Sequence, residues 1–290
     1  PSRTAASEVY AQVETDIEEA LRLMPASSKL LHKASPAAIN MLRTEYYLWK
    51  AKRLGGGNAA LSTAQSSVDA VLKAGYALLP TFADIFNLSY EANSELIWTL
   101  PNIVNEKVTP VTSPNFFAYY LAPNGDRTRL REAGYTEDEV PAGSHAQYVV
   151  PSQAYCDFLA EDARDTRTDV SVRVFEDKFL TEEVQINRMV VKFKGSFAND
   201  TRSFDSDVPV YRLAEVYLLK AEVENALGNT DAALQNLNVV AKRAYGVDNY
   251  YTARTQDAID NAIISEILKE FVAESNAARH KGFPFLLKFN

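Results

Sequence analysis

The chain has 290 residues, of which 47% are hydrophobic and 23% charged, a composition typical of a globular protein. Thirty basic residues against thirty-eight acidic ones give a net charge of −8, which disfavours a surface that follows nucleic-acid phosphates. No apolar run approaches the roughly 18 residues of a membrane-spanning helix, and the lone Cys156 excludes an intrachain disulfide and a cysteine zinc site.

The first third of the chain predicts three amphipathic helices. Apolar residues recur at helical spacing over 7–24, and again over 36–54 and 59–74, with the break Gly55-Gly56-Gly57 between the last two. Those two helices form a pair. Helix 7–24 looks like the second half of another pair whose first half would precede Pro1, so we expect an N-terminal segment to be missing.

The middle of the chain, residues 99–206, departs from this helical pattern and is called the insertion below. Six of the twelve prolines lie in its first half, which excludes long helices there. Short β-prone pieces occur at 147–150 and 189–193, and a short helix is predicted over 152–163. A long irregular segment on a helical scaffold is commonly where function lies.

The clearest helix pair covers 209–227 and 230–244. Pro209 suits a first helical turn because its missing N–H is not needed there. Gly228 can take the left-handed conformation that ends a helix, and Thr230 can cap the next one. Small residues on the facing stripes allow the two helices to approach closely: Ala221, Ala233 and Ala241.

A final helix is predicted over 255–274. Together these elements predict a mostly α fold of tetratricopeptide-like helix pairs, an α/α superhelix, with a long irregular insertion that contains short strands. We expect one domain over 1–290, in which 1–98 and 207–290 form the helical scaffold and 99–206 carries the ligand surface. Such repeats usually build binding surfaces and not catalytic centres.

Several segments match one known pattern in order. The strongest is Pro209-Val-Tyr-Arg-Leu-Ala-Glu-Val-Tyr-Leu-Leu-Lys-Ala-Glu222, followed by Leu227-Gly228 and Lys242-Arg243-Ala244. Shorter matches precede it: Ala37 to Leu48, Gly75-Tyr-Ala-Leu-Leu79, Phe82-Ala-Asp-Ile-Phe86, Ser94-Glu-Leu-Ile-Trp98, and Ser152 to Thr168 with Asp165-Thr-Arg167. In this order they resemble the SusD/RagB family of outer-membrane nutrient-binding lipoproteins. Residues 275–290 depart from the family's usual Gly-x-Arg-aromatic continuation, and members are usually longer.

The resemblance implies a non-enzymatic, cofactor-free protein that captures oligosaccharides, or in some branches peptides, for a TonB-dependent SusC-like transporter. It also implies a place on the extracellular face of the outer membrane, held there by an N-terminal lipid anchor that this chain does not contain. Nucleic acid is not an expected partner. Two alternatives remain open at this point: a cytoplasmic tetratricopeptide adaptor that grips a peptide, and a helical glycoside hydrolase.

Sugar rings bind by laying their apolar faces on aromatic side chains. Family ligand residues vary between members, so none can be carried over by position. The alternative role for aromatic residues here is to anchor the insertion to the helices. The candidate ligand-binding residues lie at the entry to the insertion and within it: Trp98, Phe116, Phe117, Tyr119, Tyr120 and Tyr148.

Other chemistry is weakly signalled. A glycosidase needs two carboxylates across the sugar, but the run Glu137-Asp138-Glu139 is typical of a solvated loop and Asp165-Thr-Arg167 of a helix-terminal ion pair. The three histidines are too dispersed for a metal site or a catalytic triad. Asn124-Gly-Asp126 is a turn signal with calcium binding as the minor alternative, and Cys156 is interpreted as a packed thiol.

Overall fold

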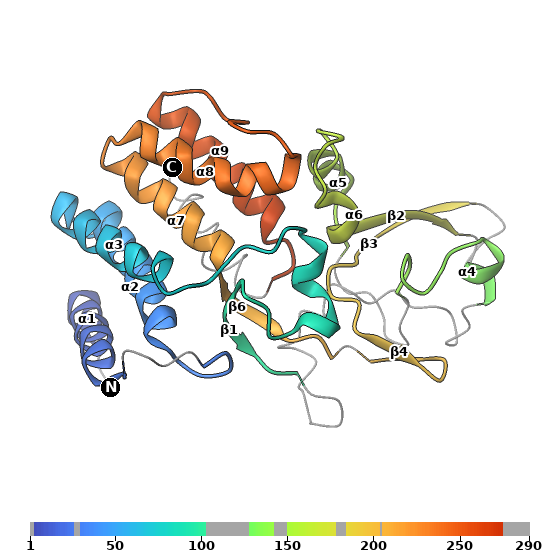
Figure 1. Cartoon of the computed structure of the whole chain (residues 1–290), viewed down its shortest axis with the longest axis horizontal. Coiled ribbons are helices and arrows are strands. Elements are labelled where there is room, and N and C mark those ends of the chain that lie inside the picture. The colour runs from blue at the N-terminus through green and yellow to red at the C-terminus, as the bar shows by residue number, and fades with distance from the viewer. Residues whose placement is uncertain are drawn as a thin grey trace.

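A computed structural model describes residues 3–25, 30–102, 128–141, 150–177, 184–203 and 205–274. Most of its regular structure is helical, which confirms the predicted fold class (Figure 1). The α-helices are α1 Ala6–Leu23, α2 Pro36–Arg53, α3 Gly57–Leu72, α4 Thr128–Glu132, α5 Gln153–Leu159, α6 Thr168–Ser171, α7 Leu213–Ala226, α8 Thr230–Tyr245 and α9 Gln256–Glu270. Two 3-10 helices, η1 Ala83–Phe86 and η2 Leu88–Tyr90, follow α3.

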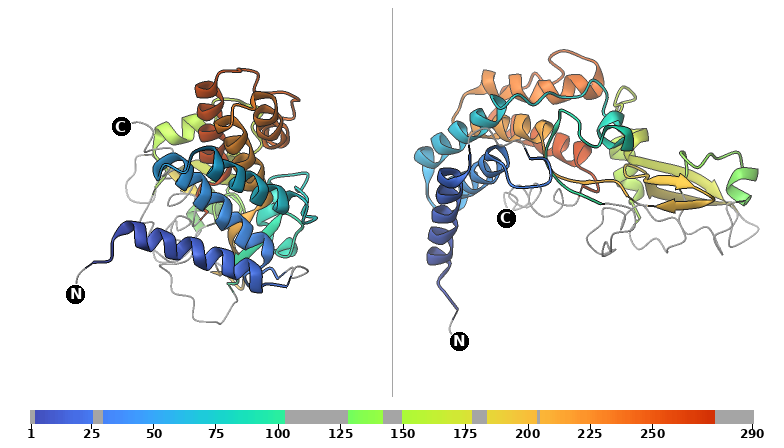
Figure 2. Two further views of the ribbon diagram at one scale, coloured as in Figure 1. Left: turned by 90° about the vertical axis from the view of Figure 1, so that its left-hand side faces the viewer. Right: turned by 60° about the horizontal axis from the view of Figure 1, so that its bottom comes forward.

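Strands are short and occur in antiparallel pairs. Strand β1 (Leu96–Leu100) pairs with β6 (Val208–Arg212), which lies more than a hundred residues later in the chain. The other two pairs are hairpins within the insertion: β2 (Val172–Asp177) with β3 (Gln185–Val190), and β4 (Ser196–Ala198) with β5 (Thr201–Ser203). The hairpins and α4 lie at the opposite end of the molecule from α1 to α3 (Figures 1 and 2).

The helical scaffold is a row of packed helix pairs. Helix α2 packs on α3 and α7 on α8; α3 contacts α7, α1 covers α2, and α9 lies against both α7 and α8. Figure 2 shows the row from two further directions. Apolar cores lie between neighbouring helices, and Ala221 and Ala233 are fully buried where α7 meets α8 and α9. Ala241 is fully buried on α8, in a cluster that includes Tyr245 and is packed by Tyr250 and Tyr251. The tetratricopeptide-like pairing predicted from the sequence is therefore confirmed.

Helix boundaries follow the expected local signals with three corrections. Ser35 caps α2 by accepting a hydrogen bond from the Ala38 N–H, with Pro36 in the first turn. Gly228 has φ +82°, as its helix-ending role requires. However, Thr230 is the first residue of α8 and not its cap, because Asn229 occupies that position. Helix α9 ends at Glu270, four residues earlier than predicted, and begins after the cap Thr255.

The third correction concerns the start of α7. The sequence predicted a helix from Pro209, but residues 208–212 are strand β6 and the helix begins at Leu213. All five residues of β6 are buried, and Pro209 lies opposite Thr99 of β1. A proline is tolerated on a strand that pairs along one side. The long-range partner β1 therefore overrides the local helical signal.

The insertion contains less regular structure, as expected. Helix α5 ends at Leu159, shorter than the predicted 152–163, and β3 ends at Val190, three residues before the predicted strand end. Most of the predicted strand at 147–150 lies outside the described residues. A small core holds α4 and the β2–β3 hairpin together, formed by Leu130, Val140, Phe175, Met189 and Val191.

Candidate functional site

Of the six aromatic candidates, Trp98 lies within the described residues. Phe116, Phe117, Tyr119, Tyr120 and Tyr148 fall in ranges outside them. Trp98 is in β1, half-buried, opposite Tyr211 of β6, and the two ring centroids are 6.2 Å apart. Its ring packs against the core between α2, α3 and α7. This position gives Trp98 a packing role, and a ligand-binding role for it stays a prediction.

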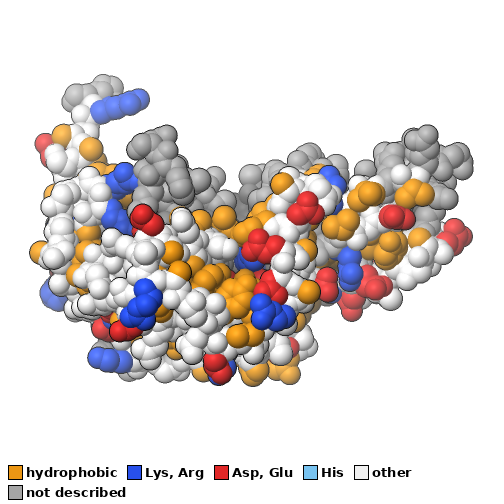
Figure 3. Space-filling model, turned by 90° about the horizontal axis from the view of Figure 1, so that it is seen from above, with side chains coloured by type: hydrophobic (Ala, Val, Ile, Leu, Met, Phe, Trp, Pro, Cys, Tyr) orange, Lys and Arg blue, Asp and Glu red, His pale blue; other side chains and the backbone are white. Residues whose placement is uncertain are grey.

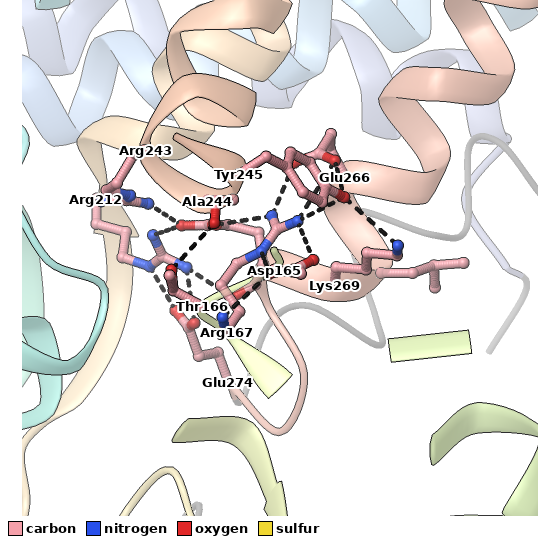
Figure 4. Close-up of polar contacts among 12 residues, drawn as sticks. Asp165, Thr166, Arg167, Arg212, Arg243, Ala244, Tyr245, Glu266, Lys269 and Glu274 are labelled. Carbon is pink, nitrogen blue, oxygen red and sulfur yellow. Dashed lines mark hydrogen bonds and ion pairs between the residues drawn. The ribbon is translucent and has the colours of Figure 1, made fainter. Parts of the chain in front are cut away.

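The largest cluster of charged side chains in the described part of the chain is buried where the insertion meets the scaffold (Figure 4). We call it the charge joint. Nearly all of its bases and acids are fully buried. The bases are Arg167, Lys192, Arg212, Arg243 and Lys269, and the acids are Glu95, Asp165, Glu266, Glu270 and Glu274, with the more exposed Glu161 as the ion-pair partner of Lys269.

Arg167 is the insertion's main contribution to the charge joint. Its guanidinium forms a bidentate pair with Asp165, at 2.8 Å for both hydrogen bonds, and reaches Glu266 at 2.7 Å and Glu270 at 3.1 Å on α9. Burial alone would lower the pKa of Arg167, but these carboxylates outweigh it and hold the pKa well above its usual value. The Asp165–Arg167 ion pair expected from the sequence exists, but it is buried and continues into α9.

Arg212, at the end of β6, is the corresponding centre on the scaffold side (Figure 4). It donates to Glu274 through Nε (2.9 Å) and Nη2 (2.8 Å), and through Nη1 to Glu270 (2.6 Å) and Glu95 (3.1 Å). Arg243 of α8 contacts the same Glu95 and Glu270. Burial opposes ionisation of Glu270, yet Arg243, Arg212 and Arg167 keep its pKa below the usual value. Strand β6, α8 and α9 are thus joined by one ionic centre.

Lys192 extends the charge joint from the insertion. Its Nζ donates to the Glu270 carbonyl at 2.8 Å and to the Glu274 carboxylate at 3.0 Å, and it lies 4.8 Å from the ring centroids of Phe82 and Phe86. Burial lowers the pKa of Lys192 to about 8, against the partial opposition of Glu274. A buried network of this kind adds little net stability but is costly to break, and it fixes geometry. We infer that it orients the insertion on the scaffold.

A smaller polar cluster lies at the root of the insertion, where the chain leaves β1 and returns to β6. The carboxylate of Asp207 accepts hydrogen bonds from the Asn102 N–H at 2.9 Å and the Thr99 hydroxyl at 3.3 Å. The ring Nδ1 of His32 lies 3.0 Å from the same hydroxyl. Glu91 Oε1 accepts from the Asp207 N–H at 3.4 Å. These contacts bind the two ends of the insertion to each other.

Three of the carboxylates considered from the sequence have local partners. Glu139 Oε2 accepts hydrogen bonds from the N–H and hydroxyl of Thr136, each at 2.9 Å, which keeps the Glu139 pKa below its usual value. Glu137 pairs with Arg131 at 3.1 Å. Asp165 is buried against Arg167. Within the described ranges, no group of three or more His, Cys, Asp or Glu side chains is placed to hold a metal ion.

Hollows in the described part of the scaffold include a small pocket and a wider cleft. A pocket of about 50 Å³ between α2, α7 and α9 is lined in part by Trp49, Leu218 and Phe271, and the indole Nε1 of Trp49 is buried with no hydrogen-bond partner among the described residues. A wider cleft of about 420 Å³ lies between α8 and the loop before α9, where Asn238 clamps the backbone of Tyr251. Cys156 is buried, and burial raises its thiol pKa, as expected for a packed cysteine.

Surface charge agrees with the composition. Among the described residues on the face seen from above in Figure 3, acidic and basic side chains are interspersed without a continuous basic area. None of the helices in the part of the chain that the structure describes is both long enough and apolar enough to cross a membrane.

Comparison with known proteins places this geometry in a family. The family model described as "SusD family" matches residues 117–278, more than half of the chain. The SusD-like protein P25 of Formosa agariphila is 28% identical over 225 residues, which cover 69% of this chain and 41% of that protein.

Solved structures show the same fold. A SusD superfamily protein from Bacteroides vulgatus is 27% identical with a TM-score of 0.76, covering 94% of this chain and 63% of that one. Surface glycan-binding protein A from Bacteroides uniformis is 19% identical with a TM-score of 0.69, covering 94% and 56%, a likeness of fold alone. The chain therefore spans less than two thirds of the length of these relatives.

Proposed function

The chain belongs to the SusD family, and on that basis we propose that it is a non-catalytic surface protein that captures oligosaccharides for a TonB-dependent outer-membrane transporter. The observation that carries the proposal is the family match over 117–278, which includes most of the insertion and the helix pair α7–α8. The same fold extends over 94% of the chain.

A glycan is proposed as the ligand class. One protein with this fold is named a surface glycan-binding protein. Aromatic residues at the entry to the insertion and within it would supply platforms for the apolar faces of sugar rings. Trp98, Phe116, Phe117, Tyr119, Tyr120 and Tyr148 are therefore proposed as ligand contacts. Capture of a peptide by the same surface is the rival outcome.

We propose that residues 1–98 and 207–290 form the scaffold and that residues 99–206 form the ligand surface. The charge joint supports this division because Arg167 and Lys192 of the insertion contact α9 and the residues that follow it. A surface held rigidly on its scaffold loses less entropy on binding than a mobile one. Helical faces of the scaffold are proposed to meet the transporter.

Binding without hydrolysis is favoured by the state of the acidic residues. Asp165 forms an ion pair with Arg167, and Glu137 forms one with Arg131. Glu139 accepts a hydrogen bond from the backbone N–H of Thr136. A glycosidase needs a pair of carboxylates free to act on either side of the glycosidic bond. We further propose that the protein acts on the extracellular face of the outer membrane, held by a lipid anchor N-terminal to Pro1.

A glycan panel separates these possibilities. The protein should bind one class of oligosaccharide in isothermal titration calorimetry and release no product on prolonged incubation. The double variant Tyr119→Ala/Tyr120→Ala should weaken binding about tenfold or more, which corresponds to about 1.4 kcal/mol. Tyr90→Ala is the matched control, since Tyr90 is an exposed tyrosine on the scaffold. Product release would refute the binding-only proposal, and affinity for peptides alone would replace the ligand class.

The transporter partnership needs its own experiment. The full-length protein, expressed in its native outer membrane with an affinity tag, should co-purify with a TonB-dependent transporter. Isolation without any such transporter under mild detergent would refute this part of the proposal while leaving ligand binding intact.

A further inference from the structure

The two ends of the insertion leave the scaffold side by side. Strands β1 and β6 are antiparallel, and Leu100 lies opposite Val208 at their open end (Figure 1). Asp207 sits at this fork, with 10% of its side chain exposed. One carboxylate oxygen of Asp207 accepts from the Asn102 N–H and the other from the Thr99 hydroxyl. Asp207, where the chain returns to the scaffold, therefore binds two residues of the segment that leaves it. Asn102 also donates to the Ser206 carbonyl.

Acidic groups are concentrated around this fork. Glu91, which follows η2, accepts a hydrogen bond from the Asp207 N–H, and Asp205 lies two residues before Asp207. Burial raises the pKa of Glu91, and the charges of Asp207 and Asp205 raise it further. The imidazole of His32 is on the other side, with Nδ1 3.7 Å from Asp207 Oδ2 and nearly half of its side chain exposed. Among the described residues, these four groups are the titratable side chains that act on the fork.

We propose that Glu91, Asp207 and His32 form a proton-controlled clasp at the root of the insertion, closed more firmly in mildly acidic than in alkaline solution. The geometry makes Asp207 the link between the two chain ends, Glu91 its neighbour of like charge and His32 its counter-ion when protonated. The clasp does not depend on which ligand the insertion binds, and it adds a means of control that the proposed function does not include.

The direction follows from the charges. When Glu91 and Asp207 are both ionised, the two carboxylates repel within a partly buried site. Protonation of Glu91 removes this repulsion. Because the folded-state pKa of Glu91 is raised, its stabilising contribution is present at low pH and is lost as the pH rises through that pKa.

Amide hydrogen exchange measured by mass spectrometry tests the clasp without any ligand. The backbone amides in peptides 96–102 and 205–212 should exchange more slowly at pH 5.5 than at pH 8.5, after correction for the intrinsic exchange rates. The expected difference is about two- to tenfold, the factor by which one net hydrogen bond changes an opening equilibrium. A peptide from α8 serves as the internal reference for global stability.

Two variants separate the groups. Glu91→Gln keeps the acceptor for the Asp207 N–H but cannot ionise. The root peptides, 96–102 and 205–212, should therefore stay protected from amide exchange at pH 8.5 in this variant, and their protection should depend less on pH. His32→Gln removes the imidazole beside Asp207 and should lower the protection of the root peptides. Glu8→Gln, a change at an exposed carboxylate of α1, should behave as the wild type. Equal protection at both pH values in the wild type, a pH response shared by the α8 peptide, or an unchanged response in both clasp variants would each overturn the proposal.

Discussion

Arg212 and Glu274 form a bidentate pair, with Nε–Oε2 and Nη2–Oε1 distances of 2.9 and 2.8 Å, and both side chains are at most 2% exposed. The pair joins the end of β6 to the turn that follows α9, across 62 residues of sequence. The guanidinium also lies 4.2 Å from the ring centroid of Phe271. One arginine therefore fixes the start of α7 against the end of α9.

Removal of this arginine should destabilise the protein severely. Arg212→Met leaves Glu95, Glu270 and Glu274 with fewer positive partners in a buried site, and breaking a buried pair typically costs about 3–5 kcal/mol. Urea unfolding followed by circular dichroism measures the loss. Arg22→Met, which breaks an exposed pair with Glu19, should leave the unfolding midpoint unchanged. Equal, small effects for both variants would contradict the ionic role assigned to Arg212.

Lys192→Met should show a pH-dependent difference from the wild type. The Lys192 pKa is lowered by burial to about 8, against about 10.4 for an ordinary lysine, so between these values the unfolded chain binds the extra proton. Wild-type stability should therefore rise relative to the variant across that interval, by about 2–3 kcal/mol at most. Near neutral pH the variant should be less stable than the wild type, because methionine leaves the Glu270 carbonyl and the Glu274 carboxylate without one of their buried donors.

Unfolding free energies of both proteins at pH 7 and pH 10 test this prediction. Groups other than Lys192 titrate in both proteins, so only the difference between them is informative. A difference that stays constant over this range would show that Lys192 keeps its charge throughout.

Ala221→Leu should destabilise the scaffold by overpacking. Ala221 is fully buried in the core that α7, α8 and α9 share, and an isobutyl group in place of its methyl group would push the helices apart. Overpacking of this kind costs about 1–3 kcal/mol. Ala59→Leu places the same group on an exposed position of α3 and should change the thermal midpoint little. If both variants melt together with the wild type, the close approach of α7 and α8 is not required.

Trp98 separates packing from binding. Its ring is half-buried against Tyr211 and the α2–α3 core, so Trp98→Ala should lower stability by about 2 kcal/mol, less than a fully buried tryptophan would. Trp98→Phe should retain most of that packing. If Trp98 also contacts the glycan, as proposed, calorimetry will show weaker binding for Trp98→Phe at unchanged stability. Full affinity in this variant would leave Trp98 with its packing role alone.

Much of the scaffold could be predicted because its signals are local. Apolar residues at helical spacing, the glycine at 228 and the proline at 36 place α2, α3, α7 and α8 within a few residues of their observed limits. Strand β6 could not be predicted in the same way, since Val208–Arg212 is a strand only because β1, far away in sequence, pairs with it. Pro209 is equally compatible with a helix start and with an edge strand, and the local pattern favoured the wrong one.

The charge joint was missed for the same physical reason. Its members come from separated parts of the chain, and each of them alone has the appearance of an ordinary surface charge. Only Asp165 and Arg167 are near neighbours on the insertion, and the sequence indicated that pair without indicating its burial. A weak signal existed at Arg212, a charge enclosed by Val-Tyr on one side and Leu-Ala on the other. The ligand-binding prediction at residues 116–120 and at 148 stays a prediction.

Strands β1 and β6 lie side by side at one edge of the scaffold. The segment between them can therefore be replaced by the corresponding segment of a relative. Leu100 and Val208 are neighbours, so the helices are unaffected by how long a path the chain takes from one to the other. Doubling such a path adds only about 0.6 kcal/mol of closure entropy. A chimera that receives a relative's segment should therefore fold if it keeps the equivalents of Glu161, Asp165, Arg167 and Lys192, described side chains of the segment that contact the charge joint.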